Sequence, residues 1–293
     1  MSTREKIMVT GANGQLGLSI RDIAPAFPQY EFIFLSKDDL PVTDHKALST
    51  SFATHSPQWL INCAAYTAVD RAEAEKDLAM QVNAEAVGMM AAITREQHCG
   101  FIHISTDYVF DGNDDQPYKE DHPTSPQNIY GLTKLEGEKK AIEFNADTII
   151  IRSSWIYSEH GRNFVKTMIR LMAEKKEINV VNDQYGNPTY ARDLGEAILE
   201  IIRKSHQPLA ISHQPSFLHF ANRGILSWYD FALGIKELTN SNCIVYPIPT
   251  SQYPTPARRP HYSALDTKKI EIDFGIVIKD WKTSLAECIK RMH

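Results

Sequence analysis

A glycine-rich turn near the N-terminus constrains the fold more than any other feature of the chain. Gly11, Gly14 and Gly17 follow a short apolar run at residues 6–10 and open an apolar-periodic stretch at residues 16–23. The first glycine permits a tight turn, the second lets the backbone approach a pyrophosphate, and the third lets the helix pack on the strand. The helix N-terminus then offers free N–H groups to phosphate. The turn therefore predicts a dinucleotide-binding unit, although three spaced glycines also occur in simple turns.

The first half of the chain continues this alternation of short apolar runs and helical patterns. We expect strands at residues 31–35, 59–63, 101–105 and 148–152. We expect helices at residues 44–54, 77–98 and 129–145, the first of them capped by Asp44. Strands that alternate with helices indicate a parallel sheet covered on both faces.

Beyond Ser153 the pattern loosens. We expect helices at residues 163–174, 192–205 and 227–239, and strands at residues 178–181, 217–221 and 244–247, before a largely extended proline-rich stretch at 247–260. The predicted fold is α/β, a doubly wound parallel sheet of the Rossmann type with a smaller α/β C-terminal substrate lobe. Residues 1–152 and later returning segments would form the dinucleotide-binding domain, and residues 153–293 mainly the second lobe, interleaved with it.

Charge and cysteine usage exclude several classes of partner. A net charge of −5 argues against nucleic acid or an anionic membrane surface. Residues 1–10 contain no apolar core of a signal peptide, and no apolar run is long enough to span a bilayer. The four cysteines have no C-x-x-C spacing, which favours thiols in a reducing cytoplasm. We expect a cytoplasmic protein that binds neither nucleic acid nor membrane.

Tyr130 and Lys134 are the strongest candidates for catalysis. Residues four apart share one face of a helix, so the ammonium lies beside the phenol. A nearby positive charge lowers the pKa of a tyrosine from its usual value of about 10, which suits proton donation to a developing oxyanion. Thr106 ends the fourth strand and should face the same crevice. Alone, this spacing is also common on surface helices, so the prediction depends on the context.

The ends of the second and third strands complete the predicted cofactor site. An acidic residue after the second strand would bind the ribose 2′-hydroxyl and repel a 2′-phosphate. Ser36 and Lys37 stand there, ahead of Asp38, so we expect NADPH, with NADH left open if Asp38 takes that position. Small residues after the third strand leave room for adenosine and the nicotinamide ribose, or simply pack against the next helix. The cofactor set comprises Gly11, Asn13, Gly14, Gln15, Leu16, Gly17, Ser36, Lys37, Asp44, Ala64, Ala65, Tyr66, Tyr130 and Lys134.

The glycine turn, Thr106 and the Tyr130-x-x-x-Lys134 helix together resemble the extended short-chain dehydrogenase/reductase family. The resemblance implies that Thr106 polarises a carbonyl, that Tyr130 donates the proton, and that Lys134 holds the ribose and tunes Tyr130. It also assigns Asn83 to the support of a proton-relay water.

Further blocks narrow the resemblance to the dTDP-4-dehydrorhamnose reductases. They lie at residues 14–17, 62–70, 105–110, 152–157, 163–165, 183–189, 227–231 and 258–260. The family implies NAD(P)H-dependent reduction of the 4-keto group of dTDP-4-dehydro-β-L-rhamnose to dTDP-L-rhamnose, a step in polysaccharide biosynthesis. The implied substrate-binding residues are Thr106, Asp107, Trp155, Asn163, Gln184, Arg258 and Arg259.

The residues themselves agree with these substrate roles but leave alternatives. The Trp155 indole is suited to stack on a sugar or base, or to pack in a core. Arg258 and Arg259 follow the rigid proline-rich stretch, and guanidinium matches phosphate oxygens, although exposed arginine pairs are also ordinary surface.

The chain also departs from the family pattern. Pro41 replaces an acidic residue found in many relatives and leaves Asp44 as the local carboxylate. Some relatives form a magnesium-bridged dimer through acidic residues, where this chain has Leu18, Ser19 and Arg192. We therefore expect no metal, and a monomer or weak homodimer.

Four alternatives to this reductase remain open. A sugar-nucleotide 4,6-dehydratase would carry Asp and Glu after the threonine, but Tyr108 follows Asp107. An epimerase, or a 4-keto-6-deoxy-sugar reductase of other stereochemistry, would share most of the motifs. A non-catalytic binding subunit, like the regulatory subunit of methionine adenosyltransferase, would not need Thr106, Tyr130 and Lys134 intact.

Overall fold

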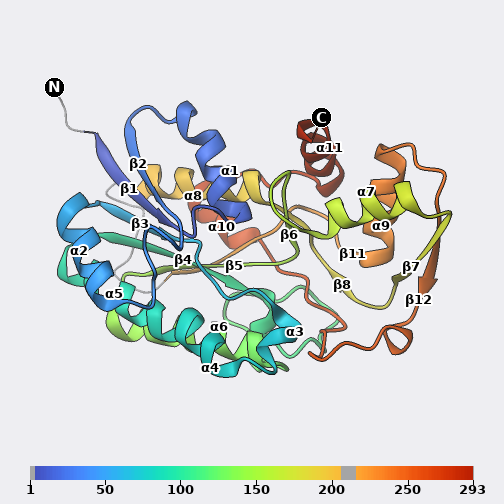
Figure 1. The fold of residues 1–293 in the computed structure, drawn as a ribbon, viewed down its shortest axis with the longest axis horizontal. Coiled ribbons are helices and arrows are strands. Elements are labelled where there is room, and N and C mark those ends of the chain that lie inside the picture. The colour runs from blue at the N-terminus through green and yellow to red at the C-terminus, as the bar shows by residue number, and fades with distance from the viewer. Residues whose placement is uncertain (1–3, 206–215, 293) are drawn as a thin grey trace.

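A six-stranded sheet organises the molecule, in the order β10-β5-β4-β3-β1-β2. The computed structural model describes residues 4–205 and 216–292, so residues 1–3 of the N-terminal stretch lie outside it. The strands are β1 (Glu5–Thr10), β2 (Tyr30–Leu35), β3 (Trp59–Asn62), β4 (Gly100–Thr106), β5 (Ile149–Ser153) and β10 (Ser216–Phe220). Neighbouring strands of this sheet pair in parallel, which confirms the predicted doubly wound fold (Figure 1).

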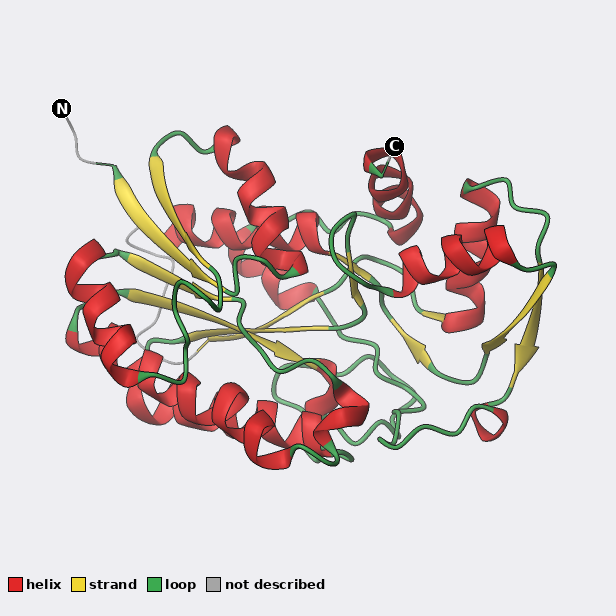
Figure 2. Cartoon of the chain, in the orientation of Figure 1, coloured by secondary structure: helices red, strands yellow, loops and turns green. Residues whose placement is uncertain are grey.

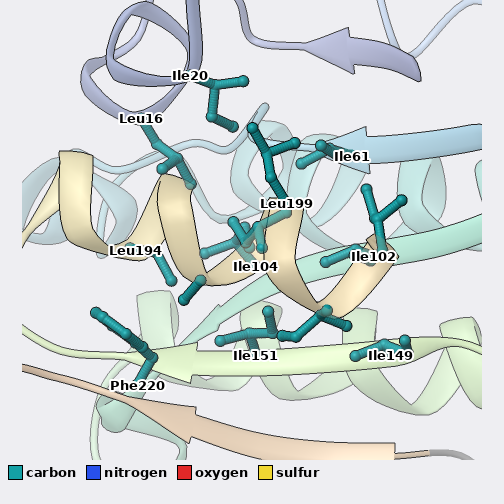
Figure 3. Packing of buried hydrophobic residues seen from close by; sticks show 14 of the residues in the cluster. Leu16, Ile20, Ile61, Ile102, Ile104, Ile149, Ile151, Leu194, Leu199 and Phe220 are labelled. Carbon is teal, nitrogen blue, oxygen red and sulfur yellow. The ribbon is translucent and has the colours of Figure 1, made fainter. Parts of the chain in front are cut away.

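Helices cover both faces of the sheet (Figures 1 and 2). One face carries α1 (Gln15–Ile23), α8 (Ala191–Ser205) and α10 (Lys268–Phe274). The other carries α2 (His45–His55), α5 (Ala86–Glu96) and α6 (Ile129–Phe144). Because side chains alternate along a strand, β1 serves both faces: Ile7 and Val9 pack with the first group of helices, and Met8 packs with the second. Figure 3 shows helix side chains such as Leu16 and Leu199 against strand isoleucines.

The predicted helix at residues 77–98 is interrupted. It consists of α4 (Lys76–Met80), a π-helical turn η2 (Gln81–Glu85) and α5. Such turns insert one residue into the helical ladder and often mark functional sites. This one carries Asn83. The predicted Asp44 cap is confirmed, since its side chain accepts from the N–H groups of Lys46 and Ala47.

The second lobe has a core of its own. It contains α7 (Phe164–Glu174), α9 (Trp228–Leu238), α11 (Trp281–Arg291) and the parallel pair β7 (Glu177–Val181) and β12 (Ile244–Ile248). Two short pairs lie beside them, β6 (Ile156–Tyr157) with β9 (Thr189–Tyr190) and β8 (Tyr185–Gly186) with β11 (Leu226–Ser227). After β9 the chain returns to the main sheet as α8 and β10, and later as α10. The domain boundary at residue 153 stays a prediction.

Among the α-helices of the described residues, three were absent from the sequence expectations: α3 (Val69–Ala72), α10 and α11. In the described ranges, no helix combines the length and apolar character needed to cross a bilayer. The four cysteines are free thiols, and burial raises the pKa of Cys63 and Cys99 to about 12.

Candidate active site

At Gly11 and Gly17 the turn is packed so closely that a side chain cannot replace a glycine hydrogen. A Cβ on Gly11, whose φ is +64°, would lie 2.6 Å from the Ala64 nitrogen. A Cβ on Gly17 would lie 2.6 Å from the Gly11 carbonyl oxygen. Helix α1 begins at Gln15, and no described side chain caps it, which leaves its first N–H groups available to an anion. The turn therefore fits the phosphates of a dinucleotide.

The other predicted residues of this turn differ in what they can offer. The Leu16 side chain is buried in the core, so only its backbone can reach a ligand, whereas Asn13 is exposed. The Gln15 side chain bonds to the second lobe: its Oε1 accepts from Ser158 Oγ at 3.1 Å and from Asn163 Nδ2 at 2.8 Å. Gln15 thus joins the cofactor turn to the residue 158–163 loop.

At the end of β2 the predicted contacts are partly engaged within the protein. The Ser36 backbone N–H and hydroxyl both donate to Asp39 Oδ2, at 2.9 and 2.7 Å. These hydrogen bonds lower the pKa of Asp39. Asp44 caps α2, while the Lys37 side chain is exposed beside the turn. Lys37 is therefore an exposed cation at this strand end, with Arg21 packed on the nearby Phe34 ring.

Asn83 holds the segment that follows β3. Its Oδ1 accepts from the Tyr66 N–H at 2.8 Å, and its Nδ2 donates to the Tyr66 carbonyl and to Thr133 Oγ1, each at 3.1 Å. The Asn83 amide thus fastens Tyr66, and with it Ala64 and Ala65, to α6. The relay-water role that the resemblance implies for Asn83 stays a prediction.

Thr106 lies near Tyr130, and Lys134 follows one turn later on α6; their catalytic roles stay predictions. The Asn128 side chain caps α6 by accepting from the Gly131 N–H, which places Tyr130 in the first turn. The Thr106 hydroxyl lies near enough to the Tyr130 phenol to lower its pKa. The Thr106 hydroxyl also donates to Asp107 Oδ1 at 2.9 Å. The Lys134 side chain is buried, and its Nζ donates to the Ile104 carbonyl at 2.6 Å.

The electrostatics of Tyr130 differ from the sequence expectation. Burial raises the pKa of Tyr130 well above its ordinary value, and the Asp107 carboxylate raises it further, while the nearby Thr106 hydroxyl opposes them. Burial also lowers the pKa of Lys134 to about 8 and raises that of Asp107 to about 6. The expected lowering by Lys134 is not found: the pKa of Tyr130 is set mainly by desolvation, and Lys134 is not among the groups that shift it. In this state Tyr130 is a neutral phenol that retains a proton to donate.

Arg259 lies close to this group. Its Nη2 donates to Asp70 Oδ2 at 2.7 Å, and its charge lowers the pKa of Tyr108 against the larger effect of burial. The Tyr108 ring meets the Tyr130 ring edge-on, with centroids 5.6 Å apart. Arg259 Nη1 and Asp107 Oδ2 are buried and find no hydrogen-bond partner among the described residues. Leaving such groups unpaired is costly, which makes both candidates to bind a polar ligand.

The remaining predicted substrate residues have protein partners. Trp155, at φ +48°, stacks on Trp228 with ring centroids 3.5 Å apart. Asn163 caps α7, and Gln184 Nε2 donates to Thr250 Oγ1 at 3.0 Å. Arg258 is exposed and donates to Gln127. Substrate roles for these four residues stay predictions.

Sequence reasoning assigned no role to four residues of this region: Asn62, His103, Tyr108 and Asp70. Asn62 and His103 could have been noticed in the sequence because each is a polar residue within an otherwise apolar strand, and both are buried.

One group of described side chains has ligand atoms close enough for a metal. The ligand atoms of Asp22, Glu159 and His160 lie within 4.8 Å of one another. His160 Nε2 contacts Asp22 Oδ2 at 2.7 Å, and the Tyr190 hydroxyl donates to Glu159. Arg192, which the sequence analysis expects in place of an acidic metal ligand, forms an ion pair with Glu196. The expectation of no metal stays a prediction.

Comparison with known proteins gives one consistent result. Residues 5–293 match the family model described as the RmlD substrate binding domain. A dTDP-4-dehydrorhamnose reductase from Burkholderia thailandensis is 37% identical over 296 residues, covering 97% of this chain and 98% of the relative.

Solved structures agree. The crystal structure of a dTDP-4-dehydrorhamnose reductase from Clostridium acetobutylicum superposes with a TM-score of 0.92 and 40% identity, covering 98% of this chain and 99% of that one. A dTDP-4-dehydrorhamnose reductase from Bacillus anthracis in complex with NADP also gives 0.92, with 35% identity and coverage of 99% and 100%.

Proposed function

The chain belongs to the dTDP-4-dehydrorhamnose reductase family, and on that premise we propose that it uses NADPH to reduce the 4-keto group of dTDP-4-dehydro-β-L-rhamnose, giving dTDP-L-rhamnose. The observation that carries the proposal is the convergence of Thr106, Tyr130 and Lys134 in a chain that matches such reductases along nearly its whole length. NADPH rather than NADH is supported by the NADP complex of the Bacillus anthracis relative and by the exposed Lys37 after β2.

The cofactor would be held by the chain's own groups. The first N–H groups of α1 and the close backbone at Gly11, Gly14 and Gly17 suit its pyrophosphate. Lys37 suits a 2′-phosphate, and the segment from Ala64 to Tyr66 would border the ribose. When bound, NADPH supplies the hydride for the reaction.

The protein's chemical contribution is a proton and the stabilisation of charge. Because burial keeps Tyr130 protonated, its phenol donates a proton to the sugar oxygen as that oxygen gains negative charge. Thr106 adds a hydroxyl hydrogen bond at the same place, and the Lys134 ammonium supplies positive charge beside Tyr130. Arg259, with its unpaired Nη1, is suited to the diphosphate of the sugar nucleotide.

The substrate class, the oligomeric state and the cellular location of the enzyme are also proposals. We infer that the substrate is a dTDP-sugar and that the enzyme acts as a monomer or weak homodimer in the cytoplasm. Light scattering coupled to size exclusion will decide the oligomeric state, with a stable tetramer as the contrary result.

The test is direct turnover. Purified protein mixed with dTDP-4-dehydrorhamnose should consume NADPH, and NMR of the product should show L-rhamnose stereochemistry at C4. Tyr130→Phe should lower kcat by about 100-fold or more, while Tyr246→Phe, on exposed β12, should match wild type. Equal rates for wild type and Tyr130→Phe would reject Tyr130 as the proton donor. The C4 epimer would identify the reductase of other stereochemistry, and NAD released on denaturation would identify a dehydratase.

A further inference from the structure

A buried row of polar side chains crosses the sheet beneath the cofactor turn. Thr10 of β1 pairs in register with Asn62 of β3, which pairs with His103 of β4. The residues two positions earlier in each strand belong to the core cluster on the α5 and α6 face, so the row points to that face. All three side chains are 1% exposed or less.

The hydrogen bonds of Asn62 fix its amide orientation. Its Oδ1 faces the backbone N–H of Ala64 at 3.0 Å, and an N–H can only donate, so an oxygen must stand there. The Thr10 hydroxyl donates to the same oxygen at 2.7 Å. Asn62 Nδ2 therefore faces His103 Nδ1, at 3.0 Å, as a donor.

This orientation determines the tautomer of His103. Because Nδ1 accepts a hydrogen bond, it carries no proton, and a neutral imidazole then has its proton on Nε2. A doubly protonated ring would point a second N–H at the Asn62 amide. Burial, with a smaller contribution from the Lys134 charge, also holds the pKa of His103 well below its usual value.

The Nε2–H of His103 faces Lys134. The distance from Nε2 to Lys134 Nζ is 3.3 Å, and Nζ also donates to the Ile104 carbonyl. An ammonium has no lone pair, so two donors confront each other while the lysine is charged. A neutral amine would instead accept from Nε2–H.

Other charges near Lys134 offset this contact only in part: the Glu138 carboxylate raises the pKa of Lys134, but burial outweighs it. Tyr130 and Glu138 lie one turn away on α6 itself, and Tyr130 is neutral. Glu138 forms a two-pronged pair with Arg152 of β5, at 2.8 and 2.9 Å, so its charge is already matched. Lys134 thus has a donor beside it and no carboxylate of its own among these neighbours.

We propose that His103 is a positioning residue for the active site: Asn62 fixes its tautomer, and its Nε2–H then governs how readily Lys134 gives up a proton. The inference deepens the proposed function, because Lys134 belongs to its catalytic group. The row itself depends only on geometry, so the NMR measurements below use cofactor-free protein and remain valid whatever the substrate is.

The first test observes the tautomer. In protein labelled with ¹⁵N-histidine, long-range proton–nitrogen NMR distinguishes a protonated from an unprotonated ring nitrogen, and the spectrum of His103→Gln identifies the His103 signals. We expect protonated Nε2 and bare Nδ1 at neutral pH. A protonated Nδ1, or an imidazolium, overturns the proposal even if the enzyme turns over dTDP-4-dehydrorhamnose.

The second test reverses the tautomer. In Asn62→Asp, the carboxylate still accepts from Thr10 and Ala64 but also accepts from Nδ1, which moves the ring proton there and leaves Nε2 as an acceptor for the ammonium. The titration of Lys134, followed by its ¹³Cε signal, should move upward by about one pH unit or more, a tenfold change in the proton dissociation constant. Asn113→Asp adds the same charge in an exposed loop and should leave this titration where wild type has it.

A second variant guards against failure of Asn62→Asp to fold. His103→Leu removes the opposing donor and should also raise the Lys134 titration midpoint. The alkaline limb of the kcat profile should move with it. An unchanged Lys134 titration in a folded Asn62→Asp or His103→Leu protein overturns the proposal.

Discussion

Asn163 Nδ2 donates to Gln15 Oε1 at 2.8 Å and so joins the second lobe to the cofactor turn across 148 positions of sequence. Asn163 also caps α7, and its Nδ2 contacts the carbonyl oxygens of Ser158 and His160. The loop that enters α7 is therefore anchored on the first residue of α1.

We predict that Gln15→Ala raises the KM for the sugar nucleotide several-fold and lowers stability by about 1–2 kcal/mol, because Ser158 and Asn163 lose a shared acceptor. Steady-state kinetics and urea unfolding will measure both. The exposed Gln97→Ala should behave as wild type. An unchanged KM would show that the loop holds its position without Gln15.

The two glycines around the start of α1 should respond unequally to alanine. A Cβ at residue 17 meets backbone atoms of Gly11 and Ala12 at 2.6–2.9 Å, whereas at residue 14 the nearest atom is 3.1 Å away. Gly17→Ala should cost about 1–3 kcal/mol of stability and weaken NADPH binding at least tenfold. Gly14→Ala should cost less stability. Fluorescence titration with NADPH and thermal unfolding provide the comparison, and equal stability losses would contradict it.

Asp107 should make the folded state less stable as the pH rises from about 4 to 6. Burial raises its pKa in the folded protein to about 6, so the folded state binds the proton more tightly than the unfolded chain. Its contribution is fully present below the unfolded pKa near 4 and is lost as the pH passes 6, a change of about 3 kcal/mol. As the pH rises from about 4 to 6, the free energy of unfolding of wild type should fall relative to that of Asp107→Asn. Asp39 should have the opposite effect, because hydrogen bonds from Ser36 lower its pKa in the folded protein. Its contribution to stability is therefore present at higher pH and is lost as the pH falls.

Arg152 and Glu138 should be strongly coupled. Their side chains are 4% and 1% exposed, so removing one partner leaves a buried charge unpaired. Arg152→Met should cost about 3–5 kcal/mol in urea unfolding. The matched control is Arg170→Met, whose pair with Glu174 is 61% and 53% exposed and should change stability by less than about 1 kcal/mol. Similar losses in both variants would contradict the effect of burial.

Local pattern was sufficient for most of the fold. The apolar runs and glycine turn of residues 6–23 specify a strand, a turn and a helix through short-range sterics alone, and the Asp44 and Ser227 caps mark helix starts in the same way. The four-residue spacing likewise places Tyr130 and Lys134 on one helix face. Helix α11 was missed although Asp280 caps it and Leu285, Cys288 and Ile289 give it a buried face.

What the sequence by itself determined is most of the elements, the chemistry of the turn and a candidate catalytic group. The tertiary structure alone decided what surrounds that group. Strand order brought Thr10, Asn62 and His103 into one row, and it set residues 216–220 beside β5. Burial, which no spacing encodes, raised the pKa of Tyr130 where its neighbouring lysine alone predicted a lower one. The physical reason is that desolvation and long-range pairing depend on which segments meet in space, while periodicity records only neighbours along the chain.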